Sequence, residues 1–325
     1  MARKAGCQEL TPTASMAVLL ENEMVGPGCY RMRLGNRQIA RHAVPGQFVH
    51  VRLRGPSLDP LLRRPFSVCL TEPEDGTFTV LYQTVGRATR ALAALPRGTE
   101  LDVLGPLGRG FEIPKADVLA RERAANRGAN AGNGASAPTI ALVAGGLGVA
   151  PLIMLGHALF RSGMALVIVV GARSREFLAG LDMLPTVSSR NTPSSVAQTE
   201  TASERAGRRF EERVALRVVT EDGSAGERGL VTDAFRDVLA SYDVALACAC
   251  GPTEMLREVA RIGQASGVPV QVSLEERMAC GLGACLGCAV KASRAAIRAG
   301  RPAYLRVCAD GPVFWSGEVD LDGTT

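Results

Sequence analysis

Four cysteines near the C-terminus constrain this chain more than any other feature of its sequence. Cys280, Cys285 and Cys288 follow the pattern C-x4-C-x2-C, and Cys308 comes after nineteen further residues. This spacing is typical of a plant-type [2Fe-2S] cluster, in which one tight loop supplies three thiolates and a distant cysteine supplies the fourth. A structural zinc site also uses four thiolates, but more often in two C-x2-C pairs. The pattern therefore favours an iron–sulfur cluster and leaves zinc as the alternative.

Glycines lie between these cysteines, at positions 281, 283 and 287. A loop that wraps inorganic sulfide needs inward-pointing amides and positive φ angles, which glycine adopts at low steric cost. The other five cysteines are scattered and do not form a disulfide pattern. The N-terminal residues 1–13 have no apolar segment of the kind that follows the basic residues of a secretory signal. We therefore expect a reducing compartment and a cytoplasmic protein.

Length and composition exclude several classes of protein. At 325 residues the chain is long enough for two domains and a small third one. Hydrophobic residues make up 46% and charged residues 21%, as in ordinary globular proteins, so wholesale disorder is excluded. The net charge of +5 is not concentrated in one stripe, and no nucleic-acid partner is expected.

Two regions differ in their hydrophobic rhythm. Short apolar runs with turn residues between them predict an antiparallel barrel or sandwich, and they lie at residues 16–21, 29–34, 47–53, 65–70, 77–83 and 100–105. After residue 138, strand-like runs alternate with helix-like runs, which predicts a doubly wound parallel sheet. The expected helices span residues 151–160, 175–184, 230–240 and 253–265.

The predicted fold is thus a β barrel plus α/β, with a small C-terminal cluster domain. The expected domains are residues 1–113, a flexible linker at 114–137, a nucleotide-binding domain at 138–272 and a cluster domain at 273–325. A polar insertion is expected at about 186–207. Residues 137–160 are long and uncharged enough for a membrane span, but their internal glycines and Pro151 favour a buried strand, a turn and a helix start, so no span is expected.

Two glycine turns are candidates for binding a nucleotide. LVAGGLGVAP, residues 142–151, places Gly145, Gly146 and Gly148 between a strand and a helix, where backbone amides and the helix dipole favour phosphate. The second turn, Cys250-Gly251-Pro252, follows a later strand of the same expected sheet. Carboxyl ends of neighbouring parallel strands line one crevice, so the two turns are expected together. Cys250 is either a small buried residue or a reactive thiol.

A basic strand in the first region is a candidate flavin site. In Arg63-Arg64-Pro65-Phe66-Ser67, the guanidinium of Arg64 suits a diphosphate and the hydroxyl of Ser67 suits the edge of a flavin ring. The alternative is an exposed basic turn that enters a core strand. The turn at residues 86–89 opens a short helix-like run and offers a second phosphate position.

These motifs together resemble those of a known family. The RPxS strand, the GGxGxxP turn and the CGP turn are similar to those of the ferredoxin-NADP reductase superfamily. LEERMACGLGACLGC and VCADGPVF, in the cysteine region, closely resemble the electron transfer subunits of NAD-dependent, heteromeric dihydroorotate dehydrogenases. The resemblance covers residues 16–319 apart from the two insertions.

The resemblance implies a set of cofactor contacts. It implies that Cys280, Cys285, Cys288 and Cys308 ligate a [2Fe-2S] cluster. It implies NAD at Gly145, Gly146, Gly148, Pro151, Cys250, Gly251 and Pro252. It implies FAD at Arg64, Pro65, Phe66, Ser67, Leu81, Tyr82, Gln83, Gly86, Ala88 and Thr89, where Ala88 replaces a common glycine. The choice between NAD and NADP stays open, since Arg173 and Arg175 suit either a 2′-phosphate or solvent.

The resemblance also implies the function and the partner. Dihydroorotate would be oxidised at FMN in a separate catalytic subunit, and electrons would pass through the cluster and FAD to NAD+, in pyrimidine (UMP) biosynthesis. Two subunits of each kind would form a heterotetramer, and this chain would hold no pyrimidine site and no catalytic side chain. The basic residues at 291–306 would either contact an acidic partner face or be solvated. The alternatives are a reductase subunit that serves ferredoxin, hydrogenase or sulfide reduction, and a zinc-containing binding module.

Overall fold

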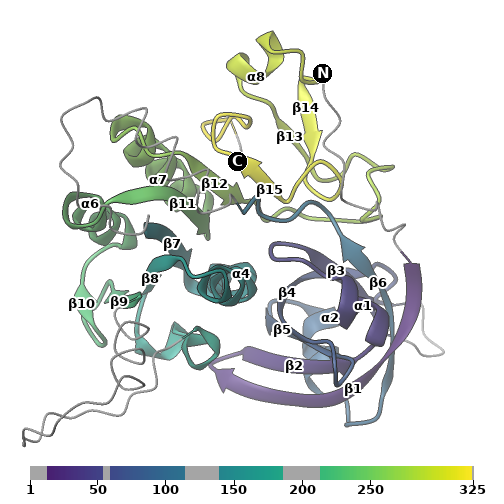
Figure 1. The fold of residues 1–325 in the computed structure, drawn as a ribbon. Coiled ribbons are helices and arrows are strands. Elements are labelled where there is room, and N and C mark those ends of the chain that lie inside the picture. Colours follow the sequence, from purple (N-terminus) through teal and green to yellow (C-terminus); the bar gives the residue numbers. More distant parts are fainter. Residues whose placement is uncertain (1–12, 54–58, 114–138, 186–212, 324–325) are drawn as a thin grey trace, which may run out of the picture.

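The first region folds into a closed six-stranded barrel in the computed structural model, which describes residues 13–53, 59–113, 139–185 and 213–323. All neighbouring strands are antiparallel, in the order β1-β2-β5-β4-β3-β6. The strands are β1 (Thr13–Gly26), β2 (Cys29–Gly35), β3 (Phe48–Arg52), β4 (Arg64–Glu72), β5 (Thr77–Gln83) and β6 (Glu100–Leu107). Two short helices, α1 (Arg37–His42) and α2 (Arg87–Ala93), follow β2 and β5. The predicted antiparallel barrel is confirmed (Figure 1).

The second region forms a sheet of the order β10-β9-β8-β7-β11-β12-β15. Every pair is parallel except β12 and β15. The strands are β7 (Thr139–Gly145), β8 (Ala165–Ala172), β9 (Val214–Thr220), β10 (Glu227–Arg228), β11 (Val244–Cys250), β12 (Val270–Ser273) and β15 (Val313–Trp315). The predicted parallel sheet is confirmed, and it gains an antiparallel edge strand, β15, from the cysteine-rich part of the chain.

Helices cover both faces of this sheet, as the continuous apolar strands require. Residues of β7 alternate between two cores: Ala141 and Val143 pack toward α6 (Val231–Ser241) and α7 (Thr253–Ala265), whereas Ile140 and Leu142 pack toward α4 (Ala150–Arg161). The 3-10 turn η1 (Gly146–Val149) joins β7 to α4, so the apolar stretch with a membrane-like hydropathy is a strand, a turn and a helix. No helix in the described ranges is long and apolar enough to cross a membrane.

One predicted helix is wrong. Residues 175–184 form two short 3-10 turns, η2 (Arg175–Phe177) and η3 (Leu181–Met183), instead of one α-helix. Gly180 separates them with φ of 75°, a left-handed conformation that ends a helix. A Cβ at Gly180 would lie 2.7 Å from Cδ1 of Leu81, so this turn packs closely on the barrel. Tertiary contact at this position overrides the helical pattern of the sequence.

Helix α4 lies between the sheet and the barrel (Figure 1). Its Met154 belongs to the core inside the barrel, while Cys69 of β4 and Leu81 of β5 belong to the core beneath α4. Helix α4 therefore covers the part of the outward face of β4 and β5 around Cys69 and Leu81. This arrangement brings the RPFS strand next to the glycine turn at the start of α4.

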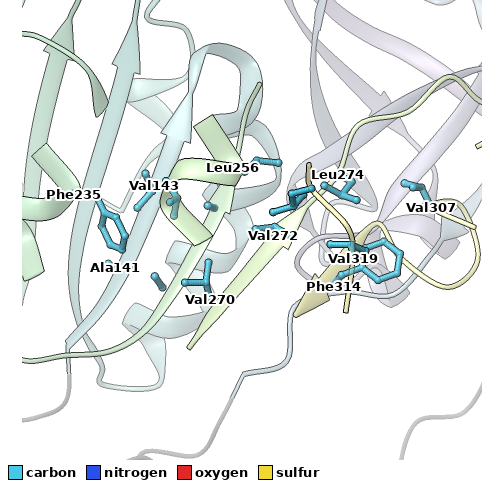
Figure 2. Packing of buried hydrophobic residues seen from close by; sticks show 14 of the residues in the cluster. Ala141, Val143, Phe235, Leu256, Val270, Val272, Leu274, Val307, Phe314 and Val319 are labelled. Atoms are coloured by element: carbon cyan, nitrogen blue, oxygen red, sulfur yellow. The ribbon is translucent and has the colours of Figure 1, made fainter. Parts of the chain in front are cut away.

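The C-terminal part shares its core with the sheet. It contains β13 (Ala289–Lys291), α8 (Arg294–Arg298) and β14 (Tyr304–Arg306), followed by β15. Buried residues continue from Val270 and Val272 of β12 through Phe314 to Val307 and Val319 (Figure 2). The cysteine-rich segment therefore has no separate apolar core. The expected linker at 114–137 and insertion at 186–207 lie outside the described residues.

Candidate cofactor sites

The four clustered cysteines converge at one place. Cys280, Cys285 and Cys288 lie in the loop between β12 and β13, and Cys308 follows β14. Each of the four sulfurs accepts a backbone N–H, at 3.2–3.4 Å: from Leu282 to Cys280, from Gly287 to Cys285, from Cys308 to Cys288 and from Gly283 to Cys308. Such bonds stabilise thiolates, which are the ligand form of cysteine. The loop thus fits an iron–sulfur cluster by the chemistry of its donors.

The thiols influence one another. The pKa of Cys280 responds to the thiol of Cys285, and that of Cys308 responds to the thiols of Cys288 and Cys280. Burial alone would raise the pKa of Cys280, but hydrogen bonds from the amide N–H groups of Leu282 and Cys285 lower it to about 6. For Cys308, burial and the adjacent Cys288 raise the pKa to about 12. In the described ranges no three His, Cys, Asp or Glu side chains are grouped closely enough for one metal ion. A [2Fe-2S] cluster does not require such a group, because its four thiolates are shared between two irons.

The backbone of the loop differs from the sequence expectation at one position. Gly281 and Gly283 adopt positive φ, at 73° and 76°, as expected. The third positive φ, 58°, belongs to Leu286 and not to Gly287. A left-handed conformation costs a residue with a side chain about 1–2 kcal/mol. The side chain of Leu286 is 62% exposed, so this strain presents an apolar group to solvent.

The cysteine loop is open on one side and buried on the other. Cys285 is exposed and lies beside exposed Leu282 and Leu286, whereas Cys288 and Cys308 are each 2% exposed. Arg306 links two parts of this segment. It donates two bonds to the Asp310 carboxylate, at 2.9 Å, and one to the carbonyl of Gly283 in the cysteine loop. The open side exposes the cysteine loop to solvent.

The predicted flavin residues divide by the alternation of β4 and β5. Phe66 and Tyr82 point into the barrel, where their rings lie 5.4 Å apart and the Tyr82 hydroxyl donates to Asn22. Burial raises the pKa of Tyr82 to about 12. Ser67 and Leu81 lie on the outward faces of these strands, and Leu81 packs in the core under α4. The strands thus bring all of these residues together, but only the outward ones face the second domain.

The two arginines at the start of β4 have different partners. Arg63 forms a two-bond ion pair with Asp102 of β6, both at 2.8 Å. Arg64 donates to the carbonyl oxygens of Leu62 and Arg63 and has no ion pair among the described residues. Arg64 therefore keeps a guanidinium available for a diphosphate, while Arg63 anchors the strand.

The turn at residues 86–89 uses the Thr89 side chain to cap the start of α2. The Thr89 hydroxyl accepts from the N–H of Gly86 and donates to its carbonyl, both at 3.1 Å. Ala88 is 4% exposed and packs in the barrel wall, and Gln83 at the end of β5 is exposed. The hydroxyl of Thr89 is therefore used to cap α2. Space for a phosphate lies instead at Gly86, because nothing lies within 4 Å of a Cβ built on it.

The two predicted nucleotide turns touch each other. Cys250 of β11 pairs with Ala144 of β7, so the strand ends lie side by side. A Cβ on Gly148 would lie 2.2 Å from the carbonyl oxygen of Cys250, and one on Gly145 would lie 2.9 Å from Pro252. Only glycine permits this approach. Pro151 is buried in the first turn of α4, while Gly146 has open space and φ of 54°.

Glu275 is a candidate residue that sequence reasoning missed. It follows β12 and lies 3.9 Å from the thiol of Cys250, beside a pocket of about 180 Å³ that Gly251 and Pro252 also line. Glu275 is exposed as a whole residue, but protein atoms crowd round its carboxylate, and this burial raises its pKa. Cys250 itself is 1% exposed, and burial and Glu275 raise its pKa well above the usual value. The sequence carried a signal, because Glu275 directly follows an apolar, strand-like run at residues 269–274.

His50 of β3 was also missed. It is fully buried, and burial together with Arg63 and Arg64 lowers its pKa to about 4. In QFVHVRL it sits on the outward face of a strand whose inward residues are apolar. A polar residue on that face signals a strand that is covered on both sides.

Known proteins match this geometry over nearly the whole chain. The profile of the iron-sulfur cluster binding domain of dihydroorotate dehydrogenase B matches residues 275–320. The electron transfer subunit of dihydroorotate dehydrogenase B (NAD(+)) from Desulforamulus reducens is 33% identical over 93% of this chain and 97% of its own length. Its counterpart from Bacillus caldolyticus is 35% identical, over 92% and 95%. This chain belongs to that family.

Solved structures agree with membership in the dihydroorotate dehydrogenase B electron transfer family. A structure of NADH-dependent reduced ferredoxin-NADP oxidoreductase superimposes with a TM-score of 0.69 at 27% identity, covering 95% of this chain and 91% of that one. The ferredoxin reductase of carbazole 1,9a-dioxygenase shares the fold alone, with a TM-score of 0.55 at 15% identity and coverages of 82% and 70%. The predicted family, fold and oxidoreductase class are confirmed.

Proposed function

We propose that this chain conducts electrons from dihydroorotate, oxidised at FMN in a partner catalytic subunit, through a [2Fe-2S] cluster and FAD to NAD+, in pyrimidine (UMP) biosynthesis. The observation that carries the proposal is the set of four cysteines near the C-terminus, each with an N–H···S bond, folded against a reductase barrel. When bound, the flavin exchanges single electrons with a cluster and a hydride with a nicotinamide. The chain itself needs no acid or base for this task.

The cysteine loop is proposed to hold the cluster. Cys280, Cys285, Cys288 and Cys308 would hold its irons, since each sulfur already accepts a backbone N–H. Cys288 and Cys308 are buried and would keep water from the inner side of the cluster. Cys285 is exposed and would lie on the side that the partner approaches.

The outward face of β4 and β5 is proposed to hold FAD. Arg64 binds its diphosphate, Ser67 and Leu81 contact the ring system, and Gly86 leaves room for phosphate at the start of α2. Phe66 and Tyr82 act from inside the barrel, by packing that fixes the two strands. The same strands and turn carry the other proposed FAD residues, which are Pro65, Gln83, Ala88 and Thr89.

The two touching turns are proposed to hold NAD. The amides of residues 145–148 and of the start of α4 would donate hydrogen bonds to the phosphates. Gly251 and Pro252 would line the opposite side, with Cys250 buried behind them. The proposed domains are residues 1–113 for FAD, 138–272 for NAD and 273–325 for the cluster, with a linker at 114–137. We propose a cytoplasmic location.

The catalytic subunit is proposed to dock at the open side of the cysteine loop, in a complex of two subunits of each kind. Large apolar side chains are exposed there and on β14: Leu282 at 53%, Leu286 at 62% and Tyr304 at 59%. An exposed apolar patch around a redox site favours a protein partner. The same C-terminal part carries basic residues on α8 and β13, which suits an acidic partner face.

The test is anaerobic reduction of NAD+ by dihydroorotate, with this chain co-expressed with an FMN-containing catalytic subunit. Activity should need both subunits and should collapse in Cys285→Ser. Cys29→Ser, which changes a buried barrel cysteine, should retain it. A complex that carries flavin and cluster but yields no dihydroorotate-dependent NADH would contradict the proposal.

A second function is favoured by one observation, the 0.69 TM-score with NADH-dependent reduced ferredoxin-NADP oxidoreductase. In that case the chain would serve a ferredoxin-linked, hydrogenase-linked or sulfide-reducing partner. Reduction of ferredoxin by NADH in the absence of dihydroorotate activity would select it.

A further inference from the structure

His50 is the one described residue with buried side-chain nitrogens that lack a hydrogen-bond partner. Its exposed fraction is 0%, and neither Nδ1 nor Nε2 has a partner among the described residues. Phe48 lies edge-on to the imidazole at 5.7 Å between ring centroids. Nearly all buried polar groups in folded proteins are paired, so an orphaned imidazole points to a group that binds beside it.

The cysteine loop lies directly on this ring. A Cβ built on Gly281 would be 2.8 Å from Nδ1 and 2.9 Å from Cε1 of His50, so the loop backbone is in contact with the imidazole. Gly281 follows Cys280 immediately and has φ of 73°, which turns the loop over the ring. On its other side, His50 pairs in the sheet with Pro65 of the RPFS strand. His50 therefore lies between the proposed cluster ligands and the proposed flavin strand.

The imidazole offers one proton donor at this boundary. Arg63 and Arg64 are its charged neighbours, and together with burial they keep the ring neutral, with one N–H and one bare nitrogen. The nearest loop is built around sulfur, and sulfur ligands and sulfides of clusters accept hydrogen bonds. Such bonds raise the reduction potential, because they stabilise the more negative reduced state.

We propose that His50 is a positioning residue of the electron path, whose N–H donates to a sulfur of the cluster on the Cys280 side. The inference rests on the proposed function, since it requires a cluster at the four cysteines. The bond fixes the cysteine loop against β3 and β4 and raises the potential of the cluster, which favours electron entry from the partner.

The first test is the midpoint potential of the cluster, followed by EPR in the reconstituted full chain. His50→Leu should shift the potential to lower values, and His50→Gln, which keeps an N–H donor, should recover part of the shift. His157→Gln is the matched control, because His157 bonds instead to the carbonyl of Met183 at 2.9 Å, and it should leave the potential unchanged. An unchanged potential in a His50→Leu protein with full iron content would overturn the inference while leaving the proposed function intact.

The second test does not depend on a His50 variant that folds. The chain has three histidines, so a tag-free His42→Gln/His157→Gln protein labelled with 15N-histidine reports on His50 alone. Pulsed EPR of the reduced cluster should show a 15N coupling and an exchangeable proton. Absence of nitrogen coupling in a protein with a normal cluster signal would also overturn the inference. Absence of any cluster signal would overturn the proposed function with it.

Discussion

A methyl group at Gly148 should separate the two nucleotide turns. In Gly148→Ala the new Cβ would lie 2.2 Å from the Cys250 carbonyl oxygen and 2.7 Å from the amide nitrogen of Gly251. Both are backbone atoms, so no side-chain rotation relieves the contact. A tolerable distance of about 3.2 Å requires a displacement of about 1 Å, and overpacking of this kind costs about 1–3 kcal/mol. Because the turns form the proposed nucleotide site, we expect KM for NADH to rise about 5- to 150-fold.

The assay is NADH oxidation with ferricyanide, which needs the flavin but not the partner subunit. Flavin content and the melting temperature are measured alongside, to confirm that the barrel is intact. Gly317→Ala is the control, because a Cβ there meets nothing within 4 Å and the residue has no positive φ. If Gly148→Ala keeps the KM of the wild type in a folded protein, the two turns do not form a shared nucleotide site and the reasoning is refuted.

Two further predictions concern the cysteine loop and the β4 anchor. Leu286→Gly should relieve a left-handed residue and raise the melting temperature of the isolated chain, yet weaken binding to the catalytic subunit in calorimetry; unchanged partner affinity would exclude Leu286 from the interface. Asp102→Asn should destabilise the chain by about 2 kcal/mol at pH 7, in urea titrations, since it weakens the ion pairs with Arg63 and Arg52. Burial alone would raise the pKa of Asp102, but the bonds from Arg63 lower it. The Asp102 carboxylate therefore stabilises the fold fully above its unfolded pKa, near 3.9, and this stabilisation is lost as the pH falls through the folded pKa. A variant whose stability below pH 4 still falls as steeply as that of the wild type would contradict this assignment.

The long periodic elements were predictable because their own residues dictate them. The six barrel strands and β7, β8, β9, β11 and β12 each carry a continuous or alternating apolar pattern, and the structure places a strand at each of these expected runs. The cysteine spacing was equally informative, since four thiolates have few uses in a reducing compartment. In both cases local chemistry and the global fold agree.

The failures occur where distant contacts decide. Residues 175–184 have a helical pattern, but Gly180 must turn against Leu81 of the barrel, and no local signal reveals that contact. The positive φ fell on Leu286 although Gly287 is adjacent. β15 joins the sheet through Val272 and Phe314, far apart in sequence. The importance of His50 likewise depends on a loop more than two hundred residues away, as the sequence numbers show.

The barrel wall explains why three binding regions fit in one short chain. One part of its outer face, on β4 and β5, is covered by α4 and the glycine turn, through Cys69 and Leu81. The adjacent part, on β3, is covered by the cysteine loop, through His50. Arg64 and Ser67 lie on β4, which pairs with β3 on one side and, on the other, with β5, the strand of Leu81. The proposed order of electron flow, from cluster to flavin to nicotinamide, is therefore the order of neighbouring strands across one face of the barrel. The cysteine segment also completes the core of the sheet through β15. A substitution that loosens the cluster loop should therefore disturb both the cluster and the nucleotide turns.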